Sequence, residues 1–247
     1  MLRCYRFLAS VLFFPALLLG LPFILLWPRG RLGLGERLGW TRCPEISGEP
    51  RFWIHAASLG EVKTCAPLLS ALRQRYPDSA ILLTATTPSG RQVARKDFRG
   101  WERLALRLLP IEVPFLCRRL LSAFRPNAVV VIETEFWPAF FSEVKRFGAA
   151  LILANGRISP LGERRVRPFR LFYRAVLACV DRFYMRSQAD YDRLTAIDPS
   201  TPARSIVAGN LKYDALTRQP MRDDFPPALI SLLGSGRWLL LASTHEG

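Results

Sequence analysis

The chain of 247 residues carries 35 lysines and arginines against 20 acidic residues, a formal net charge of +15, and 50% of its residues are hydrophobic. This apolar content excludes a disordered protein and is enough for one large domain or two small ones. The charge predicts an anionic partner, which leaves nucleic acid, anionic lipid and a phosphorylated substrate as alternatives.

The first predicted element is an apolar segment, Phe7–Trp27, in which Ser10 is the only polar side chain. As a helix it would be about 31 Å long, close to the thickness of a bilayer's hydrocarbon core. Arginines flank it on both sides, and its end lacks the small-residue pattern of a signal-peptide cleavage site, so we expect residues 1–29 to be a membrane anchor. Because of Pro15 and Pro22, a full span and a kinked helix within one leaflet both stay open as alternatives.

The next stretch, residues 30–48, is rich in Gly, Arg and Pro and is predicted to be a basic connector. From residue 49 to 214 short apolar runs alternate with longer amphipathic stretches, which predicts an α/β domain with a doubly wound parallel sheet, Rossmann-like in kind. The expected strands are 51–56, 80–84, 104–109, 128–132, 149–153, 182–185 and 205–208. The expected helices are 61–75, 89–97, 113–124, 137–147, 165–180 and 187–196.

The last stretch, residues 215–247, is predicted to be a linker followed by the start of a second domain. It begins with a polar, proline-containing run and continues with a helix at 228–233 and a strand at 238–242. The sequence given stops directly after that strand, where an α/β domain normally places a functional loop. We therefore expect the chain to be a fragment.

Polar loops follow five of the predicted strands, at the edge where parallel sheets bind their ligands. Two of these loops hold glutamate: the first carries Glu61, and the loop after the strand at 128–132 carries Glu133 and Glu135. The others supply Thr87–Gly90, Asn155–Ser159 and Gly209–Asp214. Carboxylates, cations and small flexible residues at one edge are suited to acid–base catalysis on an anion.

Several of these residues also have a purely structural explanation. Ser58 and Glu61 have the spacing of a capping box at a helix start, which is as good an explanation as catalysis. Glu133 and Glu135 favour function, although either would also stabilise the N-terminus of the helix that begins at Pro138. Lys212 fits a phosphate contact or a solvated turn.

Two further features are ambiguous or structural. His55 flanks a strand, and we expect it to be a packed, hydrogen-bonded histidine and not a catalyst. In the stretch 157–174 six arginines are interleaved with apolar and aromatic residues, which fits either a contact with anionic membrane or a solvated helix face.

Several reaction classes lack their sequence signals. The chain has no GxxxxGK[ST], no GxGxxG after a strand and no GxSxG, so ATPase, dinucleotide-binding and serine hydrolase functions lose support. The five cysteines are scattered without metal-ligand spacing, which indicates buried thiols in a reducing compartment. We expect neither a metal nor a cofactor.

Six motifs in order resemble those of the Kdo (3-deoxy-D-manno-octulosonic acid) transferases. They are Ser58-Leu59-Gly60-Glu61, Thr87-Pro88-Ser89-Gly90, Glu133-Thr134-Glu135-Phe136-Trp137-Pro138, Asn155-Gly156-Arg157-Ile158-Ser159, Gly209-Asn210-Leu211-Lys212-Tyr213-Asp214 and Ser243-Thr244-His245-Glu246-Gly247. The resemblance covers nearly the whole chain, including the apolar N-terminus.

The resemblance implies an inverting glycosyltransferase of the two-domain GT-B fold, of which this chain would form the N-terminal part. It implies transfer of Kdo from CMP-Kdo to a lipid A precursor in lipopolysaccharide biosynthesis, on the cytoplasmic side of the bacterial inner membrane. By motif position, Glu61 resembles the general base, a role that it would combine with capping, and Glu133 and Lys212 resemble groups that support the transition state.

The remaining motif residues are expected to bind substrate. On the acceptor side they are Ser58, Gly60, Thr87, Ser89, Gly90, Glu135, Asn155, Arg157 and Asn210. An incomplete donor site would contain Ser243, Thr244 and His245. Leu59 and Gly156 depart from the family's usual residues without removing a functional group. Because most CMP-binding residues of the family would lie beyond Gly247, we expect the fragment alone to be inactive.

Two other functions stay open as alternatives. One is a different membrane-associated glycosyltransferase of the same fold, with another nucleotide sugar and lipid. The other is a non-catalytic basic module that binds anionic lipid or nucleic acid, for which the charge of +15 is the direct support. If the chain is a Kdo transferase, as the resemblance implies, its expected partners are CMP-Kdo, a lipid A precursor and the anionic membrane surface, and no nucleic acid is expected.

Overall fold

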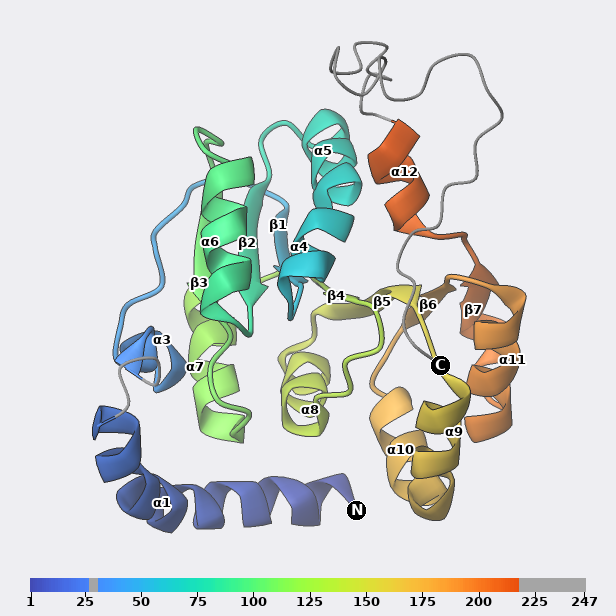
Figure 1. Cartoon of the computed structure of the whole chain (residues 1–247), viewed down its shortest axis with the longest axis horizontal. Helices are drawn as coiled ribbons and strands as arrows, with labels where there is room; N and C mark the ends of the chain where they lie inside the picture. The colour runs from blue at the N-terminus through green and yellow to red at the C-terminus, as the bar shows by residue number, and fades with distance from the viewer. Residues whose placement is uncertain (27–30, 218–247) are drawn as a thin grey trace, which may run out of the picture.

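The computed structural model describes residues 1–26 and 31–217 and has one parallel sheet of seven strands in the order β3-β2-β1-β4-β5-β6-β7 (Figure 1). The strands are β1 (Arg51–His55), β2 (Ala80–Ala85), β3 (Leu104–Leu108), β4 (Ala128–Ile132), β5 (Ala150–Gly156), β6 (Arg182–Met185) and β7 (Ser205–Val207). The seven predicted strands are thus confirmed, and so is the doubly wound, Rossmann-like fold. The direction of winding reverses between β1 and β4, which are neighbours in the sheet.

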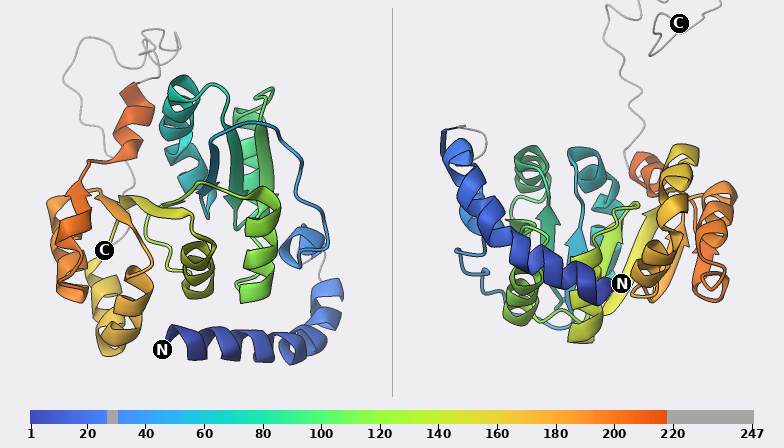
Figure 2. Two further views of the ribbon diagram at one scale, coloured as in Figure 1. Left: turned by 180° about the vertical axis from the view of Figure 1, so that it is seen from behind. Right: turned by 90° about the horizontal axis from the view of Figure 1, so that it is seen from below.

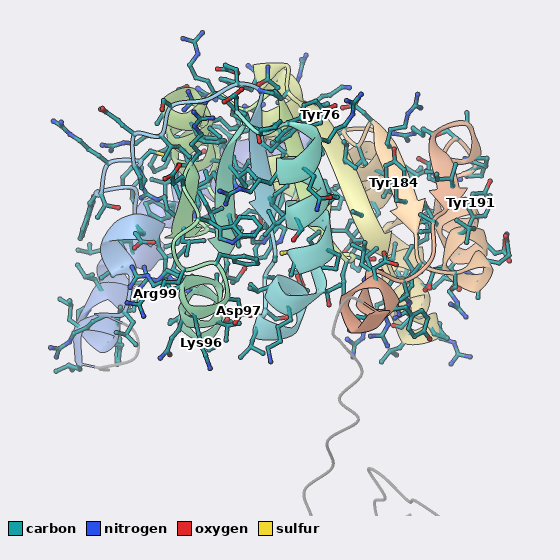
Figure 3. All side chains as sticks on the ribbon, turned by 90° about the horizontal axis from the view of Figure 1, so that it is seen from above. Tyr76, Lys96, Asp97, Arg99, Tyr184 and Tyr191 are labelled. Atoms are coloured by element: carbon teal, nitrogen blue, oxygen red, sulfur yellow. The ribbon has the colours of Figure 1, made fainter. Side chains whose placement is uncertain are left out.

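Helices cover both faces of this sheet (Figures 1 and 2). They are α1 (Leu2–Leu26), α3 (Leu34–Arg37), α4 (Leu59–Thr64), α5 (Ala66–Arg75), α6 (Pro88–Asp97), α7 (Pro114–Phe124), α8 (Pro138–Phe147), α9 (Pro160–Val166), α10 (Arg170–Leu177), α11 (Gln188–Ile197) and α12 (Leu211–Thr217), with short 3-10 turns η1 (Arg167–Phe169) and η2 (Pro202–Arg204). In the view of Figure 3, Lys96 at the end of α6 and Tyr191 on α11 lie toward opposite ends of the sheet.

Two apolar cores lie on the two faces of the sheet. Buried side chains of α4, α5 and α6 pack on one face, around Ile54 and Leu83. Those of α7, α8, α10 and α11 pack on the other, around Trp53, Phe140 and Phe183. The alternation of inward and outward residues along each strand divides the sheet in this way, so that neighbouring residues of β1 belong to different cores.

Helix α1 lies flat against the domain, across α7 and α8, with its N-terminal end beside α10 (Figures 1 and 2). The Tyr5 hydroxyl donates to Glu112 Oε2 at 2.8 Å, and Arg6 Nε donates to Glu143 Oε1 at 2.9 Å. The Phe13 ring lies 5.5 Å from that of Phe115. The opposite side of α1 is apolar and exposed, through Phe7, Leu8, Val11, Leu12, Phe14, Leu18, Leu19, Phe23 and Leu26.

In the part of the chain that the structure describes, α1 is the one helix long and apolar enough to cross a membrane, with a mean hydropathy of 2.4. Pro15 and Pro22 both lie inside it.

The helices differ from the prediction at four places. The expected helix 61–75 is divided at Cys65, after which α5 begins at Ala66 with Pro67 in its first turn. The expected helix 165–180 is interrupted by η1, where Pro168 lacks an N–H. The predicted connector contains α3, and the motif after β7 begins α12, neither of which was expected as a helix. The predicted helix at 228–233 and strand at 238–242 lie outside the described residues, and the division into domains stays a prediction.

Candidate active site

The candidate site lies at the carboxyl ends of β1 and β4, where the winding of the sheet reverses. Glu61 lies in the first turn of α4, the helix that follows β1, and the loop after β4 carries Glu133 and Glu135. Crevices at such reversal points are where open α/β sheets bind ligands. The structure therefore brings together three carboxylates that the sequence assigned to one edge.

Glu61 is almost fully buried, with 8% of the residue exposed, and both of its carboxylate oxygens are hydrogen-bonded. Oε2 accepts from the Ala57 N–H at 2.7 Å, and Oε1 accepts from the Ser58 hydroxyl at 2.9 Å. Ser58 in turn caps α4 by accepting from the Glu61 N–H at 3.3 Å. This is the reciprocal capping predicted for the pair, and it also fixes the carboxylate's orientation.

Burial raises the pKa of Glu61 above its usual range, and the charge of Glu133 raises it further, while the bonds from Ala57 and Ser58 oppose the shift. The pKa of Glu135 is also raised, by burial first and then by the charges of Glu61 and Glu133. The three carboxylates are therefore close enough to repel one another. Such mutually repelling acids are frequent in sites that transfer protons.

Glu133 occupies a left-handed backbone conformation, with φ at 61°, directly after β4. The Lys212 Nζ lies 3.4 Å from its Oε1, and their side chains are 50% and 20% exposed. Residues other than glycine, asparagine and aspartate rarely adopt this conformation. Its use here points the Glu133 side chain to a lysine on α12, and Lys212 places a cation beside the acidic cluster.

Asn155 fixes the position of α12. It also has a positive φ, at 56°, and only 3% of it is exposed. Its Oδ1 accepts from the Leu211 N–H at 3.1 Å, and Asn210 Oδ1 accepts from the Lys212 N–H, also at 3.1 Å. Asn155 Nδ2 is buried and has no hydrogen-bond partner among the described residues. These two asparagines thus hold the helix that carries Lys212.

The loop after β2 lies against the start of α4. Thr87 caps α6 by accepting from the Gly90 N–H at 3.1 Å. A Cβ added to Gly90 would meet Thr87 Oγ1 at 3.1 Å, Ala85 Cβ at 3.2 Å and the Leu59 nitrogen at 3.4 Å. Gly90 is therefore needed for close packing between α6 and α4, and neighbouring Ser89 is exposed.

The structure assigns no buried side-chain contact to the other predicted site residues that it describes. A Cβ on Gly60 would meet only Ser58 Oγ at 3.8 Å, so packing gives no reason for glycine there. The Arg157 N–H donates to Thr134 Oγ1 at 2.7 Å, which joins the loops after β5 and β4, and the Arg157 side chain is exposed. Ser243, Thr244 and His245 lie outside the described residues.

His55 is part of the core, as expected. It is fully buried, its Nδ1 lies 3.0 Å from Thr84 Oγ1, and burial lowers its pKa to about 4. It is therefore a neutral, packed histidine.

One cation beside the site was not predicted. Arg37 of α3 donates to the backbone oxygen of Thr86, in the loop after β2, and burial lowers its pKa. The only sequence signal was the basic character of residues 30–48. Within residues 1–26 and 31–217, no group of three or more His, Cys, Asp or Glu side chains is arranged to hold a metal ion.

Comparison with known proteins identifies the family to which the chain is similar. Residues 32–215 match the family model described as 3-deoxy-D-manno-octulosonic-acid transferase (kdotransferase). A 3-deoxy-D-manno-octulosonic acid transferase of Chlamydophila psittaci is 28% identical, over 98% of this chain and 57% of the relative. One from Haemophilus influenzae is also 28% identical, over 89% of this chain and 51% of the relative.

The chain thus spans little more than half the length of the curated relatives that it matches. Among solved structures, a UDP-N-acetylglucosamine 2-epimerase has a TM-score of 0.54 at 18% identity, covering 72% of this chain and 53% of that structure. At this identity the likeness concerns the fold alone.

Proposed function

The chain belongs to the Kdo transferase family of glycosyltransferases, and from this premise we propose that it supplies the acceptor side and the general base for transfer of Kdo from CMP-Kdo to a lipid A precursor. The observation that carries the proposal is the buried, oriented carboxylate of Glu61 at the reversal point of the sheet. Glycosyl transfer to a hydroxyl requires a base at that position, because the attacking oxygen loses its proton.

In this proposal Glu61 accepts the proton of the acceptor hydroxyl while the oxygen attacks the anomeric carbon of Kdo. The bond from that carbon to the CMP phosphate breaks, so CMP leaves with the bonding electrons and the anomeric configuration inverts. The raised pKa of Glu61 makes it a stronger base than an exposed carboxylate. The bonds from Ala57 and Ser58 keep the carboxylate aligned during the transfer.

Lys212 and Glu133 act beside this base. Lys212 lies half-exposed next to Glu133, where its ammonium is free to approach the donor's carboxylate or phosphodiester. Thr87, Ser89 and Gly90 would border the acceptor together with Glu135, Asn155, Asn210 and Arg157. The donor contacts would include Ser243, Thr244 and His245, and a second α/β domain would complete the cleft.

Membrane binding on the cytoplasmic side of the inner membrane is the second part of the proposal. Because α1 packs lengthwise on the domain, its exposed apolar side is arranged to enter one leaflet in the plane of the membrane. The Phe172 ring lies 5.5 Å from Tyr5 of α1, so the arginine-rich segment at 164–174 adjoins the helix. Phe169 and Leu171 of that segment are each 63% exposed.

Thiol labelling tests whether α1 lies in the plane. Cys4 is exposed near the start of α1, and an Arg31→Cys change in a Cys43→Ser background marks the opposite end. An impermeant maleimide should label both positions from the cytoplasmic side of membrane vesicles. Labelling of Cys4 from the other side would establish a span and contradict the in-plane arrangement.

A donor screen tests the reaction. A longer natural chain that includes the residues after Gly247 should transfer sugar from CMP-Kdo to a lipid A precursor, whereas the 247-residue chain alone should not. Turnover with UDP-sugars but not with CMP-Kdo would overturn the proposed donor, and turnover by the short chain would overturn the need for a second domain.

A further inference from the structure

A basic cavity of about 660 Å³ lies on the opposite side of the sheet from α4. It opens between α7 and the segment that follows α3, which runs along the β3 edge of the sheet (Figure 1). The side chain of Arg107 on β3 reaches it from the same face as Ala105 and Leu109, which pack with α7 and α8. Cavities of this size hold small organic ligands.

The cavity is lined by arginines that have no carboxylate partner in close contact. Arg107 is only 4% exposed, and its guanidinium donates to the backbone oxygens of Arg42 and Thr41 and to Thr41 Oγ1. Its Nε is buried without a hydrogen-bond partner among the described residues, and the same holds for Arg51 Nε. Burying a guanidinium is unfavourable unless a negative charge compensates it.

Nearby acids do not supply that charge. Glu36 is occupied by Arg91 and by the Leu108 N–H. Glu45 is exposed at the rim, and Glu49 comes no closer than 4.0 Å to Arg51. Arg42 and Arg119, both exposed, add two further cations at the opening. The cavity therefore has a surplus of positive charge.

One wall of the cavity is apolar. Leu116, Leu120 and Ala123 of α7 form it, together with Pro110 and Ile46. A cationic rim beside an apolar wall fits a ligand that has both an anionic group and a nonpolar part. Several guanidiniums approaching from different elements suit the multiple oxygens of a phosphate better than the two oxygens of a carboxylate.

We propose that this cavity, with Arg42, Arg107 and Arg119, binds an amphiphilic phosphate ester at a site separate from the carboxylate cluster. The phosphate would contact Arg42 and Arg119 at the opening, in the field of Arg107, and the nonpolar part would lie along α7. A membrane lipid and a free organic phosphate share this chemistry. The position beside α7, two turns or less from the α1 contact at Phe115, makes the lipid source accessible.

Protection of Cys43 measures occupancy of the cavity. Cys43 lines it and is half-buried, whereas Cys65, Cys117 and Cys179 are buried, so a Cys4→Ser chain leaves one reactive thiol. Its rate of reaction with neutral N-ethylmaleimide is followed with glycerol 3-phosphate, with monomeric dihexanoyl phosphatidic acid, and with sodium chloride at matched ionic strength. Both phosphates should slow the reaction, and chloride should not.

The variants decide whether the arginines cause the protection. Arg119→Ala and Arg42→Ala should each raise the half-protecting concentration about tenfold. Arg146→Ala, an equal charge change at an exposed residue in the last turn of α8, should leave it unchanged. Thermal melts check that each variant is folded. Protection that is equal with chloride, or equal in Arg119→Ala and Arg42→Ala, would overturn the proposal.

The two phosphates identify the source of the ligand. If phosphatidic acid protects at a concentration at least about tenfold lower than glycerol 3-phosphate does, the apolar wall contributes and a lipid is the ligand. Equal concentrations would support a free phosphate and remove the apolar wall from the proposal.

Discussion

Two regions of the molecule bury glutamates, and they treat the charge in opposite ways. Where α1 docks, Glu143 is paired with two cations, Arg6 and Arg118. At the reversal point of the sheet, three glutamates lie close together and one lysine contacts one of them. Glu143 and its two arginines thus stabilise the docking of α1, whereas the surplus of negative charge at the reversal point supports the proposed catalytic role of that cluster.

The strongest test of this comparison is Glu61→Gln in a longer natural chain with Kdo transferase activity. Loss of the base should reduce kcat by about 10²- to 10⁴-fold, with little change in thermal stability. Glu163→Gln, the same substitution at a half-exposed residue of α9, serves as the control. A Glu61→Gln variant that retains activity within about threefold would remove Glu61 as the base.

The opposite result is expected for Glu143→Gln. Only 2% of the Glu143 side chain is exposed, and its loss leaves Arg6 and Arg118 without their partner. We expect the free energy of unfolding to fall by about 2 kcal/mol and kcat to stay unchanged. The loss of stability is smaller than for a fully buried ion pair because water reaches Arg118, whose side chain is more than half exposed. Chemical denaturation in detergent measures it, and an unchanged midpoint would show that α1 does not depend on this contact.

The pH dependence of kcat/KM measures the repulsion between the carboxylates of the site. The base acts as a carboxylate, so the rate should fall as the pH drops through the raised pKa of Glu61, above the ordinary value of 4.5. Glu133→Gln removes a neighbouring negative charge, so it should lower the pKa of Glu61. The acidic limb of the pH profile should then move to lower pH by up to about one unit, and the maximum value of kcat/KM should also be lower. A shift of the acidic limb to higher pH would contradict the proposed repulsion between Glu133 and Glu61.

The smallest expected effect is a gain of stability in Glu135→Gln. Because the folded-state pKa of Glu135 is raised, the folded protein holds the proton more tightly, and stability should fall as the pH rises through that pKa. At pH 7 the neutral variant should therefore melt higher, by no more than about 3 °C, and the difference should vanish toward pH 4. A lower melting temperature at pH 7 would show that the acid is stabilising.

Local pattern predicted much of the fold and part of the site. Short apolar runs located all seven strands, and parallel strands place their following loops at one edge, which brought Glu61, Glu133 and Glu135 together. The reciprocal bonds of Ser58 and Glu61 depend on residues three apart, so spacing alone predicted them.

Contacts between distant residues were beyond such patterns. The pairs Arg6–Glu143 and Lys212–Glu133 join residues far apart in the chain, and no local pattern identifies the cation that each acid contacts. The flat packing of α1 follows from the first of these pairs, so the sequence left its orientation open. Helix α12 was missed because the contact that holds it comes from Asn155, on another strand.

Because Lys212 lies on α12, near the end of the described chain, the parts of the site are completed in a fixed order during synthesis. Domains fold from the N-terminus as the chain emerges, so β1, β4 and their three glutamates are complete well before residue 212 is made. Until α12 docks on Asn155, the acids repel one another without their cation. The nascent sheet can therefore form early, but the site is assembled only when one of the last described helices arrives.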